Sequence, residues 1–385
     1  MNAPAHHRFD VIVIGLGASG GASLYHLAKD GARVLGIDQF APPHNRGSSH
    51  GYTRIYRQAY YEAPVYVPMA LRALELWHEL ERDTGRRLFT QTGGLTIGRR
   101  EDGLIAGALL SAQQHGIAHE LLTEAEIETR FPAFKPPAGT IGLYEPTAGV
   151  LFADVCIQSH LEMARAAGAQ INTGEAVCAI HYSKSDRVFV ETNSATYEAD
   201  RVVVAAGAWA PKLLGLEHAF HVTRETVLWF QSTSRSARAS VCPVAMIALA
   251  DGRLLYSLPD FGDGFKAGLH HSGKTADAHW DWEPVSESDT TAVANALATY
   301  VPGAVGPLCE SAPCFYTSTA DRHFAIGPLP WAPNVILAAA CSGHGFKFAP
   351  AIGEAVSQMA RGIPTALPMD VFDVGRLGAP TQVPR

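Results

Sequence analysis

Residues 9–38 read FDVIVIGLGASGGASLYHLAKDGARVLGID, and this stretch decides how the rest of the chain folds. An apolar run enters a glycine-rich turn, a helical pattern follows, and a second apolar run ends on Asp38. This order is the dinucleotide-binding fingerprint. Gly15 permits the tight turn, Gly17 lets the backbone approach a pyrophosphate, and Gly20 allows the helix to pack closely on the sheet. Asp38 is placed to bind ribose hydroxyls.

The composition describes a well-packed globular chain. Of its 385 residues, 47% are hydrophobic and 17% are charged, and the length suggests two domains or one large α/β domain with an insertion. The formal net charge is −7 and no basic run occurs, so we expect no nucleic-acid partner. No apolar leader precedes the first strand, and no run approaches the roughly 18 apolar residues of a membrane span. We therefore expect a cytoplasmic protein without membrane contact.

The six cysteines form no CxxC pair and show no zinc-ligand spacing, so we predict no metal site. Each is expected to be a small buried side chain in a reduced, intracellular protein.

Later segments look like further pieces of the nucleotide-binding half. A buried strand with a small-residue turn is predicted at 200–211, a strand at 334–339 and a helix at 351–361. Between 222 and 313, alternating strands favour a mixed or antiparallel sheet, interrupted by a helix at 287–300. The nucleotide-binding unit is therefore discontinuous.

That discontinuity favours FAD, because a nicotinamide dehydrogenase usually keeps its Rossmann unit contiguous and lacks a late glycine-rich loop. We predict a mixed α/β and α+β protein in which a Rossmann-like FAD-binding domain carries an inserted substrate domain built on a mixed or antiparallel β-sheet. The FAD-binding domain comprises residues 1–90, 146–218 and 321–385. The substrate domain comprises residues 91–145 and 219–320.

Residues 39–57, QFAPPHNRGSSHGYTRIYR, are predicted to form a loop without a regular element, because prolines and glycines interrupt them. The loop is rich in donors, including Ser48, Arg54 and Arg57. Since it leaves the carboxyl edge of a parallel sheet, we favour the interpretation that it lines cofactor and substrate over that of a solvated polar loop.

Three cations stand in poorly charged surroundings: Arg57, Lys266 inside a predicted strand, and Lys347 in the late glycine-rich loop. A cation beside an isoalloxazine stabilises negative charge, and a Lys/Arg pair clamps a carboxylate. The alternative is that these cations are exposed or salt-bridged. Cys314 is expected at a turn between the β-rich part and the last strand of the nucleotide-binding domain. From its spacing alone, it is predicted to be a core cysteine. His270 is, on the same grounds, a structural histidine.

Together these segments resemble the monomeric sarcosine oxidase and N-methyltryptophan oxidase family, within the glycine oxidase-like and D-amino-acid oxidase-like flavoproteins. The resemblance covers residues 9–362. Beside the glycine-rich turn it rests on Pro42-Pro-His, Gly51-Tyr-Thr-Arg-Ile-Tyr-Arg57, Glu145-Pro-Thr-Ala-Gly149, Ala206-Gly-Ala-Trp209, Phe265-Lys-Ala-Gly-Leu-His270, Cys314-Phe-Tyr-Thr317 and Ser342-Gly-His-Gly-Phe-Lys347.

The resemblance implies a role for each residue of the site. Cys314 would bear FAD as an 8α-S-cysteinyl thioether, Lys266 would activate O₂ over one flavin face, and Arg54 would lie against the other. Arg57 and Lys347 would hold the substrate carboxylate. The amine would be surrounded by Tyr256, His270 and Tyr316, of which His270 and Tyr316 are assigned to catalysis with Lys266 and Arg54. The implied cofactor-binding set is Gly15, Gly17, Gly20, Asp38, Ser48, Arg54, Cys314, Gly343, Gly345 and Lys347.

The activity implied is oxidation of a secondary N-methyl amino acid to an imine, which hydrolyses to the primary amino acid and formaldehyde while O₂ becomes H₂O₂. The enzyme would act as a monomer on a small amine. Two alternatives stay open: an oxidase or dehydrogenase of a cyclic imino acid such as pipecolate or proline, and a non-catalytic nucleotide-binding subunit.

The chain departs from the family pattern in three places that bear on the substrate. Ala340-Cys341 stands where the family typically has Gly-Phe, and residues 229–231 and 271–282 do not match the sarcosine enzyme closely. In the last of these, Trp280 and Trp282 are expected either to accommodate a bulky substrate side chain or to cover the surface.

Overall fold

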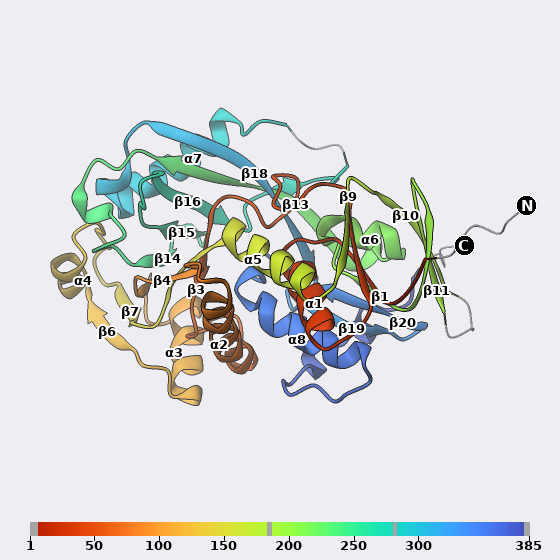
Figure 1. Cartoon of the computed structure of the whole chain (residues 1–385). Helices are drawn as coiled ribbons and strands as arrows, with labels where there is room; N and C mark the ends of the chain where they lie inside the picture. Colours follow the sequence, from red (N-terminus) through yellow and green to blue (C-terminus); the bar gives the residue numbers. More distant parts are fainter. Residues whose placement is uncertain (1–6, 183–186, 280–282, 381–385) are drawn as a thin grey trace, which may run out of the picture.

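A computed structural model of the chain describes residues 7–182, 187–279 and 283–380 (Figure 1). Two sheets organise it. One lies with helices α1 and α8 on one side of the molecule, and the other lies with helices α3, α4 and α7 on the opposite side. The predicted mixed α/β architecture with two halves is confirmed.

Counted over the described residues, the first sheet has eight strands, and it contains the opening fingerprint. Four successive pairings are parallel, and they join β9 to β2, β2 to β1, β1 to β12, and β12 to β20. Its strands are β1 (His7–Ile14), β2 (Val34–Asp38), β9 (Gln170–Thr173), β10 (Val177–Tyr182), β11 (Val188–Thr192), β12 (Thr196–Val204), β19 (Ala325–Leu329) and β20 (Ala332–Ala339).

Helices cover this sheet because its central strands are apolar on both faces. Val11, Ile12, Val13 and Ile14 are all buried, as expected for a parallel strand between two layers. Helix α1 (Ala18–Lys29) packs between α5 (Ala153–Ala166) and α8 (Ala349–Ala360). The predictions of a strand within 200–211, a strand at 334–339 and a helix at 351–361 are confirmed by β12, β20 and α8.

The second sheet, which has nine strands in the described part of the chain, is mixed, as predicted. Most neighbours are antiparallel, whereas β14 and β5 run parallel. Its strands are β5 (Gly94–Gly98), β6 (Glu120–Thr123), β7 (Ile141–Glu145), β13 (Phe220–Phe230), β14 (Val244–Ala248), β15 (Leu254–Leu258), β16 (Phe265–His270), β17 (Lys274–Thr275) and β18 (Leu308–Thr319). The accompanying helices are α3 (Gly103–His115), α4 (Glu124–Arg130) and α7 (Glu287–Tyr300).

The prediction that residues 39–57 contain no regular element is wrong at their end. Strand β3 (Thr53–Tyr56) pairs with β8 (Gly149–Phe152), which also pairs with β4 (Phe89–Gln91). Ile55 and Tyr56 suit a strand, and the partner strand comes from almost a hundred residues further along the chain. Helix α2 (Val67–Thr84) follows β3.

The placement of Cys314 at a turn is also wrong. Cys314 lies inside β18, a strand of 12 residues that pairs with β13 along its length. Among the described strands, β18 has only β13 as a neighbour, so Pro313, next to Cys314, lies in an edge strand. An edge strand tolerates a proline, because one side of its backbone needs no ladder hydrogen bonds.

The strands also fall on either side of the predicted domain division. Those of the eight-stranded sheet lie within 1–90, 146–218 and 321–385, and those of the nine-stranded sheet lie within 91–145 and 219–320. The exact boundaries stay a prediction.

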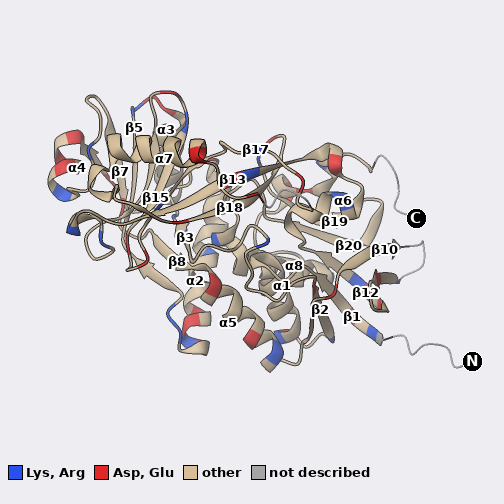
Figure 2. Ribbon diagram, turned by 90° about the horizontal axis from the view of Figure 1, so that it is seen from above, with Lys and Arg blue, Asp and Glu red and all other residues tan. Residues whose placement is uncertain are grey.

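Charged positions of both signs are interspersed over the outer helices and loops, for example on α4 and α5 (Figure 2). No helix in the described part of the chain is long and apolar enough to cross a membrane.

Candidate active site and cofactor cavity

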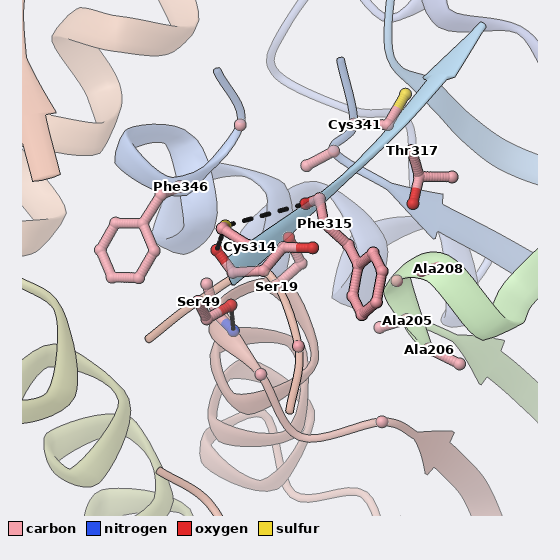
Figure 3. A pocket seen from close by; sticks show the side chains of 18 of the residues that line it. Ser19, Ser49, Ala205, Ala206, Ala208, Cys314, Phe315, Thr317, Cys341 and Phe346 are labelled. Carbon is pink, nitrogen blue, oxygen red and sulfur yellow. Dashed lines mark hydrogen bonds between the residues drawn. The ribbon is translucent and has the colours of Figure 1, made fainter. Parts of the chain in front are cut away.

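A cavity of about 780 Å³ extends between the two sheets, from the glycine-rich turn to the inner side of the nine-stranded sheet. Figure 3 shows part of it, where Ser19 and Ser49 lie on one side of Cys314 and the small residues Ala205, Ala206 and Ala208 lie beside the Phe315 ring. The predicted residues that line it are Gly15, Gly17, Asp38, Ser48, Arg54, Arg57, Tyr256, Lys266, His270, Cys314, Tyr316, Gly343, Gly345 and Lys347.

The glycine-rich turn has the shape that the sequence predicted. Gly15 has a φ of +85°, and an ideal Cβ atom at Gly20 would lie only 1.8 Å from the carbonyl oxygen of Gly15. A Cβ atom at Gly17 would lie 3.2 Å from Ser49 Oγ, across the cavity wall. Gly20 does not itself line the cavity. Its missing side chain allows α1 to pack against the turn.

The amino end of α1 provides an anion site in this turn. Helix α1 begins at Ala18, its cap residue Gly17 has no side chain, and its first turn contains no acidic residue. The positive end of the helix dipole therefore points at the cavity without an internal counter-charge. The glycine-rich turn, the positive end of the α1 dipole and the volume of the cavity together fit the pyrophosphate of a dinucleotide.

Asp38 is anchored on the same turn. Its Oδ2 accepts a hydrogen bond from the N–H of Leu16 at 2.7 Å, and its Oδ1 accepts one from the N–H of Phe40 at 2.8 Å. Each carboxylate oxygen has two lone-pair sites, so these bonds leave acceptor capacity toward the cavity. Asp38 thus both shapes the turn and lines the nucleotide end.

Lys266 is buried in the middle of β16, with 3% of its surface exposed. Its Nζ donates to the carbonyl oxygens of Gly51 at 2.7 Å and Thr53 at 2.6 Å, and lies 5.3 Å from the Trp229 ring centroid. No ion pair forms at Lys266 within the described residues. Burial, with repulsion from Arg54, holds the pKa of Lys266 well below its usual value. The alternative of an exposed or salt-bridged lysine does not fit these contacts.

Arg54 and Cys314 meet at the Ser48 carbonyl oxygen, which accepts from Arg54 NH2 at 2.8 Å and lies 3.7 Å from Cys314 Sγ. The Cys314 side chain is 5% exposed and faces the cavity. Burial raises the pKa of the Cys314 thiol, whereas Arg54 and Lys266 lower it. The thiol is thus enclosed, but it lies beside two cations.

Arg57 and Lys347 converge on the ring of Tyr60, at the end of the cavity remote from the glycine-rich turn. The Arg57 guanidinium carbon lies 4.2 Å from the ring centroid, and Lys347 Nζ lies 5.1 Å from it. Arg57 NH2 also binds both carboxylate oxygens of Glu62 at 2.7 Å. Arg57 is therefore salt-bridged as well as facing the cavity.

Lys347 has neutral partners. Its Nζ donates to the carbonyl oxygen of His344 at 2.9 Å and to the Tyr60 hydroxyl at 3.4 Å. Burial, followed by repulsion from Arg57, lowers the pKa of Lys347 to about 7. An anion that binds here would supply the missing counter-charge.

The neighbouring polar groups are neutral. His270 Nδ1 lies 3.1 Å from the Tyr316 hydroxyl, and burial holds the pKa of His270 well below its usual value. Tyr256 comes from β15, beside the backbone of Gly268. These three groups form a wall with hydrogen-bonding capacity and without a charge of its own.

The late loop is shaped by its glycines. Gly343 has a φ of +80°, and a Cβ atom there would lie 2.2 Å from Tyr316 Cε2. A Cβ atom at Gly345 would lie 2.1 Å from the carbonyl oxygen of Ala340. Cys341, one of the departures from the family pattern, is buried with its Sγ 3.5 Å from the His323 carbonyl oxygen.

Some features lie outside what the sequence identified or what the structure describes. Glu62 and Tyr60 contact the two cations, but nothing in their spacing distinguished them from other polar residues. His344, in the quoted motif Ser342-Gly-His-Gly-Phe-Lys347, was not assigned a role in the site. Trp280 and Trp282 lie outside the described residues. Within those residues, no group of His, Cys, Asp and Glu side chains is arranged to hold a metal ion. Of the six cysteines, Cys178 and Cys309 are exposed, so the expectation of burial is wrong for these two.

The fold and the cavity define a dinucleotide-dependent oxidoreductase, and comparison with known families identifies its class. Residues 10–359 match the family described as FAD dependent oxidoreductase, so the chain belongs to that family. The prediction of a FAD-binding protein of this family is confirmed.

Within that family, the chain is 40% identical over 380 residues to monomeric sarcosine oxidase of Bacillus sp. (strain B-0618), covering 96% of each chain. It is 35% identical over 370 residues to N-methyl-L-tryptophan oxidase of Yersinia pseudotuberculosis serotype O:1b (strain IP 31758), covering 96% of this chain and 99% of the relative. The fold is similar to that of NikD, an unusual amino acid oxidase essential for nikkomycin biosynthesis, in its open form. That structure has a TM-score of 0.84 and 23% identity, covering 95% of this chain and 97% of NikD.

Proposed function

We propose that the protein is a FAD-dependent oxidase of secondary N-methyl amino acids. It converts the amino acid and O₂ to an imine and H₂O₂, and the imine hydrolyses to the primary amino acid and formaldehyde. One observation carries the proposal: the buried Arg57–Lys347 pair and the buried Lys266 line one cavity, which also begins at the dinucleotide cradle. The full-length similarity to sarcosine and N-methyl-L-tryptophan oxidases supports it.

FAD, when bound, accepts two electrons from the carbon–nitrogen unit of the substrate and passes them to O₂. The glycine-rich turn, Asp38 and the amino end of α1 hold its nucleotide part. Arg54, Cys314 and the late loop with Gly343 and Gly345 line the stretch beyond. The remaining chemistry belongs to the side chains of the chain.

Arg57 and Lys347 hold the substrate carboxylate in this proposal. A guanidinium presents five N–H donors in a planar fork. Arg57 can therefore donate to a second carboxylate while its NH2 group remains bound to Glu62. The carboxylate in turn stabilises the charged form of Lys347. The two cations thereby orient the substrate with its amine toward the middle of the cavity.

The uncharged wall formed by Tyr256, His270 and Tyr316 surrounds the amine. Because nearby cations oppose a further positive charge, the bound amine is favoured in its free-base form. The free base has the lone pair that assists oxidation of the adjacent carbon. His270, which is itself neutral, accepts from or donates to Tyr316 without adding repulsion.

We further propose that Lys266 activates O₂ and that Cys314 carries FAD as an 8α-S-cysteinyl thioether. Protonated Lys266 stabilises the negative charge that forms when O₂ receives an electron, and that negative charge in turn favours the protonated form of Lys266. Low local polarity strengthens the effect. The thiolate is the reactive form of a cysteine; burial raises the pKa of the Cys314 thiol, and the neighbouring Arg54 and Lys266 partly offset that rise. Action as a monomer, as in the name of the sarcosine oxidase relative, belongs to the same proposal, and the cytoplasmic location stays a prediction.

The deciding experiment is an absorbance scan of the purified protein in two parts. Acid precipitation first tests the linkage: a yellow pellet is expected, and for Cys314→Ala a colourless pellet with flavin in the supernatant. Flavin that stays bound to Cys314→Ala would exclude the linkage.

Anaerobic addition of sarcosine, N-methyltryptophan, N-methylalanine, proline and pipecolate in turn then tests the reaction. We expect bleaching of the flavin absorbance by an N-methyl amino acid, followed by rapid H₂O₂ formation when air is admitted. Bleaching only by proline or pipecolate would favour the cyclic imino acid alternative. Slow H₂O₂ formation would indicate a dehydrogenase, and no bleaching by any of the five would favour a non-catalytic subunit.

A further inference from the structure

Glu145 is a buried carboxylate outside the wall of the main cavity, and it binds the backbone just after Arg57. Only 3% of its surface is exposed. Its Oε1 accepts from the N–H of Gln58 at 2.8 Å, and its Oε2 accepts from the N–H of Ala59 at 2.9 Å. The Thr147 hydroxyl donates to Oε1 at 3.2 Å. Since both oxygens accept, the contacts fit the ionised form.

Glu145 also joins two parts of the fold. It is the last residue of β7 in the nine-stranded sheet, where it pairs with Gly94 of β5. Gln58 and Ala59 follow β3, which belongs to the three-stranded sheet. The carboxylate thus ties the segment that carries Arg57 to the sheet that carries His270 and Tyr256.

The charges of Arg57 and Glu145 also interact, although the two side chains form no direct ion pair in the described contacts. Both line a second, small cavity of about 10 Å³, together with Thr96. Burial raises the pKa of Glu145, and the two backbone N–H groups and Arg57 lower it. A buried carboxylate is costly unless several donors and a cation compensate it, and the described contacts supply these.

Two sets of contacts therefore position the Arg57 side chain. The guanidinium is bound to Glu62, and the backbone at residues 58 and 59 is bound to Glu145. Without the Glu145 contacts, the Arg57 guanidinium keeps its partners Glu62, the Ala59 carbonyl oxygen and the Tyr60 and Tyr61 rings, but all of these belong to the same segment and none to the nine-stranded sheet.

We propose that Glu145 is a positioning residue that sets where the Arg57 guanidinium meets the substrate carboxylate. The proposal rests on the proposed function, in which Arg57 binds that carboxylate. Glu145 acts through the backbone of residues 58 and 59 and through its charge, without touching the substrate.

The test is Glu145→Gln in the holoenzyme. Glutamine keeps the size, but its NH₂ group faces one of the two backbone N–H donors, which loses its acceptor. We expect the KM for sarcosine and the Kd for propionate, read from the flavin absorbance, each to rise about tenfold. At saturation, kcat stays within about twofold of the unmodified enzyme. This split between KM and kcat separates positioning from a general loss of structure.

Glu81→Gln is the matched control, because Glu81 Oε1 accepts from the N–H groups of Leu88 at 2.8 Å and Phe89 at 3.0 Å, and Glu81 does not line the cavity. It should lower the melting temperature but leave KM and Kd unchanged. If Glu145→Gln does not accumulate as holoenzyme, Thr147→Val removes a single donor to Oε1. It should raise KM and Kd in the same direction, by about two- to threefold.

The outcomes distinguish this role from the proposed function. Unchanged KM and Kd in Glu145→Gln, with a melting temperature lowered as in Glu81→Gln, would overturn the positioning role. In the Thr147→Val fallback, unchanged values would do the same. If Arg57→Met binds propionate as tightly as the unmodified enzyme, Arg57 is not a carboxylate ligand, and both the proposed carboxylate site and the role of Glu145 are contradicted. Weak binding by Arg57→Met with normal binding by Glu145→Gln would overturn only the role of Glu145.

Discussion

The two ends of the cavity are built in opposite ways. The nucleotide end comes chiefly from residues 14–19 and 37–49, which are close in sequence and lie on a rigid parallel sheet. The other end is assembled from β3, β15, β16, β18 and the late loop, which are distant in sequence. The first end is made mainly of backbone and small residues, and the second of long charged and aromatic side chains.

This difference shows what each end requires. A pyrophosphate needs close backbone approach and a helix end, which one short motif provides. In the proposed function, the other end binds a carboxylate and O₂ through buried cations, and such side chains must be brought together from several elements. Substitutions should therefore abolish cofactor binding at the first end and change individual steps at the second.

The largest effect is expected at the nucleotide end, for Gly20→Val. The new side chain would overlap the Gly15 carbonyl oxygen, which lies 1.8 Å from an ideal Cβ atom, so α1 cannot pack on the turn. We expect protein that contains almost no flavin or that does not fold. The flavin-to-protein absorbance ratio measures this. Gly103→Ala is the control, because the position has no heavy atom within 4 Å of its Cβ and should keep full flavin content. Full flavin content in Gly20→Val would contradict the structure of the turn.

At the other end, Lys266→Met should slow reoxidation by O₂ by about 10²-fold or more, because a preorganised charge is lost from a buried site. Anaerobic reduction by the substrate should change much less. Stopped-flow absorbance separates the two half-reactions. Lys274→Met, at an exposed position in β17, should behave like the unmodified enzyme. Equal slowing of both half-reactions would rule out a specific role in O₂ activation.

The pH dependence of carboxylate binding should show the effect of Lys347. Its lowered pKa, about 7, means that it is charged below that pH and neutral above it. The affinity for propionate should therefore be full in mild acid and fall about tenfold between about pH 6 and about pH 8. Titration of the flavin absorbance measures this, with Lys347→Met as the control that should remove the dependence. A flat profile in the unmodified enzyme would argue against Lys347 as a carboxylate ligand.

The smallest effect is expected for Tyr316→Phe, which removes the hydroxyl next to His270 Nδ1 but keeps the ring against Gly343. Loss of one such hydrogen bond corresponds to about 0.5–1.5 kcal/mol, or about two- to tenfold in kcat/KM. Steady-state kinetics with sarcosine measures it. Tyr300→Phe, in α7 outside the cavity wall, should have no effect on kcat/KM. An equal loss in both variants would assign the effect to stability.

The sequence alone predicted most of the nucleotide end and the general architecture. The turn from Gly15 to Gly20, the strand that ends on Asp38 and the mixed inserted sheet all follow from local patterns, because period, glycine geometry and burial are short-range properties. It did not predict β3 or the position of Cys314 within β18, because both strands depend on partners from distant parts of the chain. Pairing of that kind leaves little local signal.

Residue types also identified Arg57, Lys266 and Lys347 as unusual, but not what surrounds them. Only the tertiary structure decided that Lys266 donates to two carbonyl oxygens and that the Arg57 guanidinium is bound to Glu62. It also decided that Glu145 accepts from the backbone just after Arg57. The sequence determines which groups a chain has and the local conformations that they favour. The environment that sets their charge and direction depends on long-range packing, and for that reason it appears only in the folded molecule.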